Sequence, residues 1–368
     1  MKNTDSLRVL LVSRKFPPST GGMEEFSYQM LQALQQRDDV AVDAVTYGGS
    51  NRWLPFVLPA LAVKTVISLV RNRPDVLYVT DGLLSPLAAA CRWLFRLPTA
   101  VTVYGLDITY SNPVYQHLVV PTFPYNDRLL PISRAAEQAA RDKGISDDML
   151  TVIPGGVDTQ KYYSPGADRD DAEQVLADRG IDIDLTGKTL LLSVGRLVER
   201  KGLQWFTDRV MPQLPEEHVY VICGDGPQHE AVQQAVEEHG LDDRVFPLGE
   251  VTGPPLNRLY STADLLLMPN IRVEGDMEGF GLVAVEASSC GTPVVASDME
   301  GMKDAVVEGG NGVRVSPEEP SAFIDGIEQG LDMDRDDVRT FTREEFSWET
   351  RGEQYAAVFQ ELNETLHT

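Results

Sequence analysis

The sequence predicts an α/β protein with two doubly wound parallel-sheet domains. Along the whole chain, short runs of β-branched and aliphatic residues alternate with longer stretches of helical periodicity, which is the pattern of parallel strands joined by crossover helices. The rhythm occurs twice, and the 368 residues of the chain exceed the roughly 250–300 residues at which a single core stops growing. Ligands of such sheets bind beyond the C-terminal ends of the strands, so we expect the two domains to face each other across a cleft.

The first half of the chain contains the strand-like runs of one domain and the helical patterns that separate most of them. The predicted strands are residues 7–12, 40–47, 76–79, 99–104, 129–132 and 151–153. The predicted helices are residues 23–36, 84–94 and 134–143. Strands and helices that alternate in this way form a parallel sheet covered on both faces.

The second half repeats this order. Its predicted strands are residues 189–194, 219–223, 244–248, 265–268, 293–297 and 312–315. Its predicted helices are residues 203–214, 228–239, 281–290 and 321–331.

A polar, acidic segment separates the two halves. Residues 155–186 are rich in turn-forming and charged residues, which is typical of a linker, and a short helix is predicted inside it at 172–179. We therefore expect an N-terminal domain over residues 1–170 and a C-terminal domain over residues 171–347. No strand follows the last helical stretch, residues 348–368, so this helix should pack back on the N-terminal domain.

The charge of the chain argues against nucleic-acid binding. There are 32 lysines and arginines against 56 aspartates and glutamates, for a formal net charge of −24. An acidic protein repels a phosphate backbone unless its cations are concentrated in one patch, and no short window of this sequence gathers such a patch. We expect no nucleic-acid partner.

The sequence predicts neither a metal site nor a disulfide framework nor a leader peptide. Cys91, Cys223 and Cys290 lie far apart in apolar surroundings, where a free thiol packs as a small apolar group. The longest apolar stretch, residues 53–70, is interrupted by Pro55, Pro59 and Lys64 and falls short of a clean membrane span. We expect a cytoplasmic protein without a metal ion.

Two loops that follow predicted strands have the residues of an anion site. Gly21 and Gly22 precede a helix, where backbone amides and the helix dipole attract negative charge, although paired glycines are also the mark of a plain tight turn. After the strand at 189–194, Arg196 and Lys201 stand where they could grip a diphosphate. The alternative for this second loop is a pair of solvated surface charges.

A third loop argues against a dinucleotide-binding protein. The glycines of Gly224-Asp225-Gly226-Pro227 allow a tight turn from strand to helix, and Pro227 suits the first position of that helix. A dinucleotide fingerprint needs a third glycine at position 229, where this chain has His229. We therefore set the dehydrogenase interpretation aside.

The fourth motif is the most informative, and it covers residues 278–293, which read EGFGLVAVEASSCGTP. Glu286 lies in a helix that is apolar nearly all round, so its carboxylate needs a partner, and ribose hydroxyls would be one. Glu278 stands just before that helix, beside amides that attract an anion, and can act on a sugar next to a bound phosphate. A helix cap and one paired core glutamate are the structural alternative.

These motifs, in this order, resemble the family 4 retaining glycosyltransferases. The resemblance rests on Glu278 and Glu286 with seven residues between them, on the run GTPVVAS from Gly291, and on the glycine-containing loops above. Segments 103–107 and 153–158 add to it, so that it covers almost the whole chain. Members of this family have the GT-B fold, in which two Rossmann-like domains enclose a cleft, and the resemblance implies that fold here.

The resemblance also implies an activity and a role for each motif. It implies an enzyme of class EC 2.4 that moves a sugar, with retention of anomeric configuration, from a nucleotide-diphosphate-sugar donor to a glycan, lipid-linked or small-molecule acceptor. The N-terminal domain would bind the acceptor and the C-terminal domain the donor, without a metal or other cofactor. By similarity, Arg196 and Lys201 neutralise the diphosphate, Glu286 binds ribose and Glu278 is catalytic. The remaining donor contacts would come from Gly21, Gly22, Gly279, Phe280, Gly281 and Leu282.

The chain departs from the family in the segment Val103-Tyr104-Gly105-Leu106-Asp107. The family often has a histidine where this chain has Tyr104, with Asp107 following the glycine. A tyrosine can donate a hydrogen bond to a sugar hydroxyl but carries no positive charge near neutral pH. We include Tyr104 and Asp107 among the catalytic candidates.

Two other functions and one further contact stay open. The first alternative is a nucleotide-sugar binding protein with weak or lost transferase activity, of which Tyr104 would be the sign; the second is another GT-B enzyme, such as a nucleotide-sugar epimerase. Residues 53–71 combine large apolar side chains with Lys64, Ser68 and Arg71 at helical spacing, a pattern that suits a membrane interface. We therefore expect either a peripheral contact of residues 53–71 with the inner face of the cell membrane or simple packing of this helix on its own domain.

Overall fold

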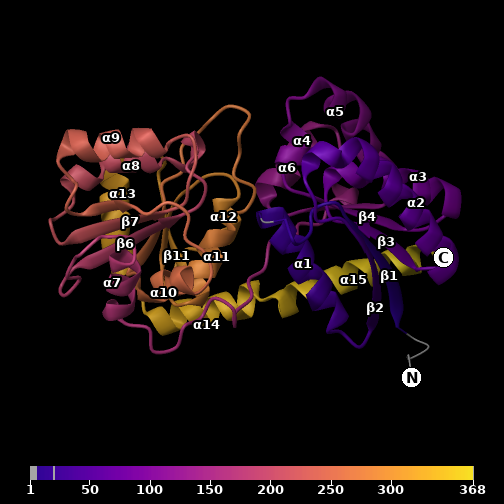
Figure 1. Cartoon of the computed structure of the whole chain (residues 1–368). Coiled ribbons are helices and arrows are strands. Elements are labelled where there is room, and N and C mark those ends of the chain that lie inside the picture. Colours follow the sequence, from indigo (N-terminus) through magenta and orange to yellow (C-terminus); the bar gives the residue numbers. More distant parts are fainter. Residues whose placement is uncertain (1–5, 20, 368) are drawn as a thin grey trace. The chain divides into compact units, whose positions relative to one another are not determined.

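The computed structural model describes residues 6–19 and 21–367 and divides the chain into two compact units (Figure 1). The first unit extends to Gly156 and also includes the C-terminal helix from Trp348, and the second unit is Val157–Ser347. Each unit is built on a parallel sheet with helices on both faces. This confirms the predicted α/β class with two parallel-sheet domains.

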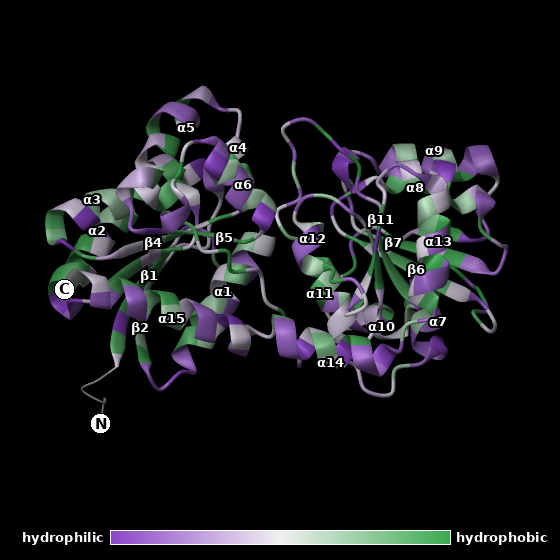
Figure 2. Ribbon diagram, turned by 180° about the vertical axis from the view of Figure 1, so that it is seen from behind, coloured by the Kyte–Doolittle hydropathy of each residue, from purple (hydrophilic) through white to green (hydrophobic). Residues whose placement is uncertain are grey.

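The sheet of the first unit has five parallel strands. Their order is β2 (Val40–Thr46), β1 (Leu7–Ser13), β3 (Val76–Val79), β4 (Thr99–Val103) and β5 (Arg128–Pro131). Almost every residue of the inner strands is buried, as expected for a parallel sheet covered on both sides. The strands accordingly form the hydrophobic interior of the ribbon in Figure 2.

Alternate residues of these strands face two different helix layers. Leu10 and Leu77 belong to the core beneath α2 (Leu54–Asn72) and α3 (Ser85–Phe95). The neighbouring residue of β3, Tyr78, points the other way, and its ring lies 5.5 Å from Tyr355 and 5.2 Å from Phe359 of α15 (Trp348–His367). On that face α15 packs beside α1 (Gly22–Gln35). The shorter helices of this unit are η1 (Asn51–Trp53), η2 (Gly82–Leu84), α4 (Leu106–Thr109), α5 (Pro113–Leu118), η3 (Val120–Tyr125), α6 (Arg134–Asp142) and η4 (Asp147–Met149).

The strand predicted at residues 151–153 does not form. Thr151 and Ile153 donate backbone hydrogen bonds of 3.1 and 3.0 Å to the carbonyls of Leu129 and Pro131 in β5. Pro154 follows directly and has no N–H to continue the ladder. The segment therefore runs beside the sheet edge without becoming a strand of it.

The sheet of the second unit has six parallel strands. Their order is β11 (Gly312–Val315), β10 (Val294–Ser297), β9 (Leu265–Met268), β6 (Thr189–Val194), β7 (His218–Cys223) and β8 (Val245–Pro247). One face is covered by α8 (Leu203–Arg209), α9 (His229–His239) and α13 (Pro320–Leu331). The other helices are α7 (Arg169–Ala177), α10 (Pro254–Thr262), α11 (Leu282–Ser289), α12 (Met302–Ala305) and α14 (Arg335–Phe346), with the short turns η5 (Glu199–Lys201) and η6 (Met211–Gln213).

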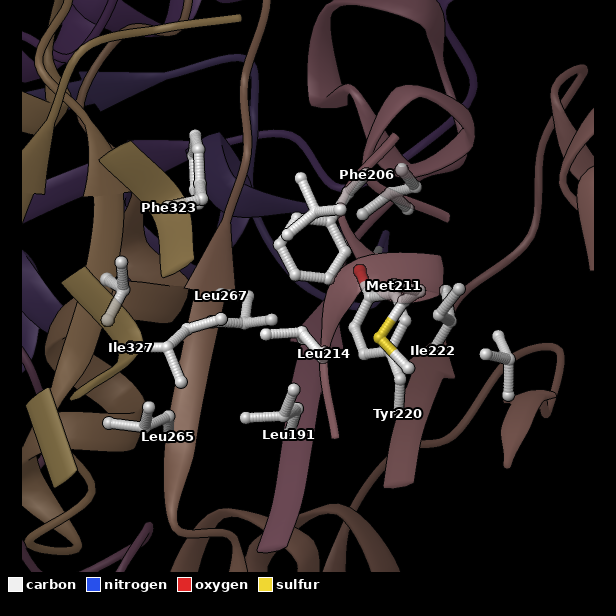
Figure 3. Close-up of a cluster of buried hydrophobic side chains, with 14 of the residues drawn as sticks. Leu191, Phe206, Met211, Leu214, Tyr220, Ile222, Leu265, Leu267, Phe323 and Ile327 are labelled. Carbon is white, nitrogen blue, oxygen red and sulfur yellow. The ribbon is translucent and has the colours of Figure 1, made fainter. Parts of the chain in front are cut away.

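Aliphatic and aromatic side chains together fill the core between this sheet and α8 and α13 (Figure 3). The ring of Phe206 lies 5.1 Å from Tyr220 of β7 and 5.8 Å from Phe323 of α13. Leu191 and Leu267, from the two central strands, complete the layer. This core holds the ends of the strands in place, which is where the candidate site lies.

Residues 157–168 pack on the second unit. The N–H of Val157 donates to the carbonyl of Phe346 at 2.7 Å, and the ring of Tyr162 lies 6.1 Å from Tyr260. The Sγ of Cys290 also donates to the carbonyl of Tyr162. The division expected at residue 170 from composition therefore falls inside the second unit, because this polar segment is wound over that unit's surface.

Candidate active site

Three loops meet at the sheet edge of the second unit, where β6, β7 and β9 end, and glycines let their backbones approach closely. A Cβ on Gly224, after β7, would lie 1.9 Å from the carbonyl oxygen of Gly195, after β6. A Cβ on Gly202 would lie 1.9 Å from the carbonyl oxygen of Pro269, after β9. Such distances exclude any side chain. Close backbone packing therefore positions the charged residues between Gly195 and Gly202.

Glu278 is the centre of an ion cluster at this edge. Its Oε2 lies 2.5 Å from Nζ of Lys201 and 2.6 Å from Nη1 of Arg200, and it accepts a longer hydrogen bond of 3.4 Å from Asn270. The side chains of Glu278, Lys201 and Arg200 are only 12%, 13% and 18% exposed. The structure thus brings together Lys201 and Glu278, both predicted as site residues, and adds Arg200 and Asn270.

The surroundings of Glu278 decide its charge. Burial alone raises the pKa of the carboxyl group, but the charges of Lys201 and Arg200 outweigh it and hold the pKa below the ordinary value. Glu278 is therefore ionised at neutral pH and accepts hydrogen bonds. A carboxylate with a low pKa is a weak general base but a good acceptor for a sugar hydroxyl.

Arg196 lies in the same loop but is not tied into this cluster. Its side chain is exposed, and none of the ion pairs formed among residues 6–19 and 21–367 involves it. A small pocket beside it is lined by Gly195, Lys201 and Asn270. The guanidinium is thus available to an anionic ligand.

The residues after Glu278 form the start of α11. Gly281 has φ of 92° and caps the helix in the left-handed region, where glycine is unstrained. The side chain of Phe280 is 3% exposed, and its ring packs 6.2 Å from Phe346, so only its backbone can meet a ligand. The N–H of Glu278 already donates to Oε2 of Glu300 at 2.6 Å.

The two other predicted residues of this turn have different surroundings. Gly279 lies against Gly301. A Cβ on Gly301 would lie 2.2 Å from the carbonyl oxygen of Gly279. Leu282 is the first residue of α11 and is half-buried.

Glu286, one turn further along α11, has a protein partner. The hydroxyl of Tyr260 donates to its Oε2 at 2.9 Å. Burial, and then the charge of Glu286, raise the pKa of Tyr260 well above its usual range, so the hydroxyl stays a donor. The need for a partner, inferred from the apolar helix, is met at least in part by Tyr260.

In the first unit, Tyr104 and Asp107 lie together after β4. The Oδ2 of Asp107 accepts backbone hydrogen bonds from Gly82 at 3.0 Å and Tyr104 at 3.4 Å. The Tyr104 ring packs edge-on against Phe26 at 5.5 Å. Its hydroxyl is buried and has no hydrogen-bond partner within the described residues, and burial raises its pKa well above the ordinary value. The hydroxyl is a permanent, unused donor.

A second carboxylate, Asp81, faces Asp107. Burial, and then the charge of Asp81, raise the pKa of Asp107 to about 6. Asp81 is itself fully buried and pairs with Nε of Arg14 at 2.9 Å through Oδ1. Its Oδ2 and the hydroxyl of Tyr115 have no partner in the part of the chain that the structure describes. Buried polar atoms are almost always paired, so this group of unsatisfied atoms is suited to the hydroxyls of a ligand.

Gly21 and Gly22 begin α1, and a carboxylate of the chain lies over them. A Cβ on Gly21 would come within 2.6 Å of Oε2 of Glu24. The Nζ of Lys15 lies 2.8 Å from the other oxygen of that buried side chain. In this structure Glu24 thus occupies the helix start where the sequence predicts a phosphate, and Lys15 supplies the positive charge.

Sequence reasoning missed several polar residues of these two edges, among them Arg200, Asn270, Asp81 and Arg14. Asp81 and Arg14 directly follow or closely follow predicted strands, so the rule that ligands bind at strand ends could have found them. Arg200 is adjacent to Lys201, but nothing in the sequence pairs it with Glu278. Throughout the described ranges, no group of three or more His, Cys, Asp or Glu side chains is placed to hold a metal ion.

Comparison with known families and structures agrees with this architecture. Residues 188–333 match the family described as glycosyl transferases group 1, and residues 21–156 match the glycosyl transferase 4-like domain. An uncharacterized glycosyltransferase of Methanocaldococcus jannaschii is 24% identical to the chain, over 88% of the chain and 89% of its own length. A GDP-mannose-dependent alpha-(1-6)-phosphatidylinositol monomannoside mannosyltransferase of Mycolicibacterium smegmatis is 24% identical over 95% of the chain and 97% of its own.

Solved structures share the fold at low identity. Anabaena HepE in complex with UDP superposes with a TM-score of 0.75 at 20% identity, covering 96% of this chain and all (100%) of that one. Its complex with UDP-glucose has a TM-score of 0.73 at 21% identity and the same coverage.

Proposed function

Because the chain belongs to the group 1 glycosyltransferases, with the GT-B fold, we propose that it transfers a sugar from a nucleotide-diphosphate-sugar donor to a hydroxyl of a glycan, lipid-linked or small-molecule acceptor. The observation that carries the proposal is the cation-rich loop after β6. It holds an exposed Arg196, which forms no ion pair with any described residue, and a Lys201 that is bound to the buried Glu278. In a chain of net charge −24, such cations are the local compensation that an anionic ligand needs.

In the proposed mechanism the cations stabilise the leaving diphosphate. Arg196 offers a fork of donors and Lys201 a point charge, and both interactions grow stronger as negative charge develops on the leaving group. Lys201 then divides its hydrogen bonds between diphosphate and Glu278, while Arg200 keeps Glu278 ionised. We assign to Glu278 the binding of a donor-sugar hydroxyl, and to Arg200 the positioning of Glu278.

The names of the similar proteins support the class of donor. The HepE complexes contain UDP and UDP-glucose, and the M. smegmatis relative is named as GDP-mannose-dependent. All are nucleoside diphosphates or their sugars, but they differ in base and sugar. We therefore propose a nucleotide-diphosphate sugar as the donor and leave its base and sugar to the test below.

We place the acceptor on the first unit, at Asp107, Asp81 and Tyr104. With a pKa of about 6, Asp107 is mostly ionised at neutral pH and can accept the proton of an attacking hydroxyl. Tyr104 offers an unused donor to the same ligand. Ligand hydroxyls would satisfy the polar atoms for which the described residues provide no partner.

Retention of anomeric configuration is part of the proposal because the family resemblance implies it. The new bond then forms on the face of the sugar from which the diphosphate leaves. Proton NMR of the product's anomeric position is the direct test. A product of opposite configuration to the donor contradicts this part of the proposal and leaves the transferase assignment intact.

The decisive experiment is a panel of nucleotide sugars tested first for binding and then for transfer. A donor at one hundred times its Kd stabilises the fold by about 2.7 kcal/mol, enough to raise the melting temperature clearly. At the same donor concentration Arg196→Ala should reduce this shift to less than about half, whereas Arg343→Ala, at an exposed position on α14, should keep it in full. Absence of a shift with every donor contradicts the proposal.

The second step separates the transferase from its alternatives. The transferase joins the sugar to an acceptor, which mass spectrometry detects. If the chain binds a donor but transfers its sugar to none of a set of glycan, lipid and small-molecule acceptors, it is a nucleotide-sugar binding protein. The presence of Tyr104 in place of the family's histidine favours this alternative. Conversion of the donor sugar without any acceptor would instead identify an epimerase.

A further inference from the structure

A long helix of the first unit presents large apolar side chains to solvent. The most apolar window of residues 51–72 has a mean hydropathy of 1.9, and only 17% of it is buried. Phe56, Val63, Ile67 and Val70 are 72%, 59%, 50% and 62% exposed. Their spacing of three, four or seven residues places them on one side of α2. Isolated exposed apolar residues are ordinary, but a continuous stripe of them is the mark of an interaction surface.

The end of α3 continues this surface. Trp93 and Leu94 are 81% and 62% exposed. Phe95, together with Val70 and Leu69 of α2, lines a surface hollow that joins the ends of the two helices, which also lie side by side in Figures 1 and 2. We call this surface the apolar face and define it by Phe56, Val63, Ile67, Val70, Trp93 and Leu94.

Cations surround the apolar face in a protein that is otherwise strongly acidic. The exposed cations of residues 51–96 with no ion pair to any described residue are Arg52, Lys64, Arg71, Arg73 and Arg96. The only acids of this segment are Asp75 and Asp81, and both pair with arginines outside it, Arg8 and Arg14. This part of the surface therefore has a positive excess within a chain of net charge −24.

Both helices end in an arginine with left-handed backbone conformation. The φ angles of Arg73 and Arg96 are 47° and 53°. Glycine is the usual residue there, because a side chain strains the backbone in this region. The dipole at a helix C-terminus favours a cation, and these two arginines also place positive charge beside the apolar face.

The other side of α2 ties the helix to its own domain. Leu61, Thr65 and Leu69 are buried, and the helix contacts β1 and β2 of the sheet. A helix held in this way lies flat, with its exposed side outward, and cannot cross a bilayer without taking the sheet apart. What it can do is enter an interface with one face.

We propose that the apolar face and the five cations around it form a docking surface for an anionic lipid bilayer. The aromatic and aliphatic side chains would enter the boundary between headgroups and acyl chains, and the cations would contact anionic headgroups. A second copy of the chain is a poorer occupant, since a two-fold contact would bring the two cationic rims together. The proposal goes beyond the transfer reaction and does not depend on the identity of donor or acceptor.

Co-sedimentation of the full chain with vesicles tests the proposal. Vesicles of phosphatidylcholine are compared with vesicles containing about a third phosphatidylglycerol, at low and at high salt, because the attraction of cations to an anionic surface is screened. We expect binding to the anionic vesicles at least about tenfold stronger than to the neutral ones, and weaker at high salt. The variant Lys64→Gln with Arg71→Gln should weaken binding about 25-fold, since each cation near such a surface is worth about fivefold.

A matched control removes the same charge elsewhere. Arg209→Gln with Arg343→Gln, two exposed arginines of the second unit, should bind as the wild type does. Phe56→Ser with Ile67→Ser should lower binding to both kinds of vesicle, and a thermal-unfolding curve shows whether this variant is folded; if it is not, the charge variant decides alone. Equal weakening by the control, or wild-type binding that is no stronger to anionic vesicles, overturns the proposal. One further result overturns the proposal. If the chain does not bind vesicles of either kind but forms a concentration-dependent dimer, and Phe56→Ser with Ile67→Ser abolishes that dimer, the apolar face is a contact between two copies of the chain.

Discussion

Arg196 and Lys201 follow the same strand, but only Lys201 is tied into the fold. Arg196 is exposed and has no ion pair in the described ranges, whereas Lys201 lies 2.5 Å from the buried Glu278. Arg196→Ala should therefore change the free energy of unfolding by less than about 0.5 kcal/mol and weaken donor binding by about 1.5–3 kcal/mol. Lys201→Ala should weaken donor binding to a similar degree and also lower the free energy of unfolding by about 1–3 kcal/mol, because the buried Glu278 loses one of its two cations and keeps Arg200.

Urea denaturation measures the first quantity, and calorimetric titration with the donor measures the second. Lys201→Arg is the control, since it retains the charge beside Glu278. Equal stability losses in the two alanine variants would contradict the distinction between a ligand-binding cation and a structural one.

Asp107 should make both stability and rate depend on pH near 6. Its pKa is raised to about 6 in the folded chain, against about 3.9 in the unfolded chain. The protonated form thus favours folding, so this contribution is complete below about pH 4 and is lost as pH rises through about 6, to a total of about 3 kcal/mol. If Asp107 also accepts the acceptor's proton, kcat/KM should rise with pH around 6, where the carboxylate of the folded chain forms.

Asp107→Asn is the matched change, because it keeps the size of the side chain and an oxygen for the Gly82 amide. Its free energy of unfolding should lack the fall between about pH 4 and 6, and its kcat/KM should be low with no rise near pH 6. A wild type and variant with parallel pH curves would show that Asp107 titrates elsewhere or not at all in this range.

The hydroxyl of Tyr104 is a feature that the fold does not need. It is buried without a partner among the described residues, and a buried group without a hydrogen bond costs about 1–3 kcal/mol. Tyr104→Phe should therefore be as stable as the wild type or up to about 1 kcal/mol more stable in urea denaturation. A loss of transfer rate in this stable variant would assign the hydroxyl to the substrate; a clear loss of stability would mean that it has a partner after all.

At the scale of the element, glycines decide how closely the loops of the second unit approach. Gly202 and Gly240 have almost the same backbone, with φ of 64° and 62°. A Cβ on Gly202 would lie 1.9 Å from the Pro269 carbonyl oxygen, whereas one on Gly240 meets nothing within 4 Å. Gly240→Ala should thus cost only the conformational strain, about 1–2 kcal/mol, and Gly202→Ala should cost several kcal/mol more because the loop must move.

The consequences for binding should differ as well. Gly202 follows Lys201 directly, so displacement of its loop should also weaken donor binding, whereas Gly240→Ala should leave donor affinity unchanged. Denaturation and titration of the two variants, side by side, check this. Equal destabilisation would mean that the loops adapt to the extra atom.

The sequence predicted elements well where periodicity and turn chemistry agree. The strands of both sheets and the helix at 282–289 follow from alternating apolar runs and the glycines that bound them. The prediction of a strand at 151–153 was wrong. Its residues have a real β-propensity, but Pro154 has no N–H with which the ladder of hydrogen bonds could continue. The domain boundary at residue 170 was predicted from composition. A polar composition indicates that a segment is exposed to solvent, but it does not indicate on which of the two units the segment packs.

At the scale of the whole molecule, the residues of the candidate site also fall into those that the sequence could predict and those that it could not. Residues on one motif, such as Glu278 and Glu286, could be found from spacing and from the cost of a carboxylate in an apolar helix. Arg200 beside Glu278, Tyr260 beside Glu286 and Asp81 beside Asp107 join segments far apart in sequence. Such pairs depend on strand order and on loop packing, which local patterns do not encode.

The distribution of charge over the whole molecule predicts opposite effects of salt on folding and on membrane docking. With a net charge of −24, the compact state is opposed by self-repulsion, and salt shortens the range of that repulsion from about 10 Å at 0.1 M to about 3 Å at 1 M. The melting temperature should therefore rise by about 5 °C between these concentrations, equally with sodium chloride and choline chloride, because screening does not depend on the cation. Binding to anionic vesicles should fall over the same range, since it rests on the positive cluster in residues 51–96. A melting temperature that stays constant or falls would mean that the acidic groups are so widely spaced, or so well paired, that their repulsion does not limit folding.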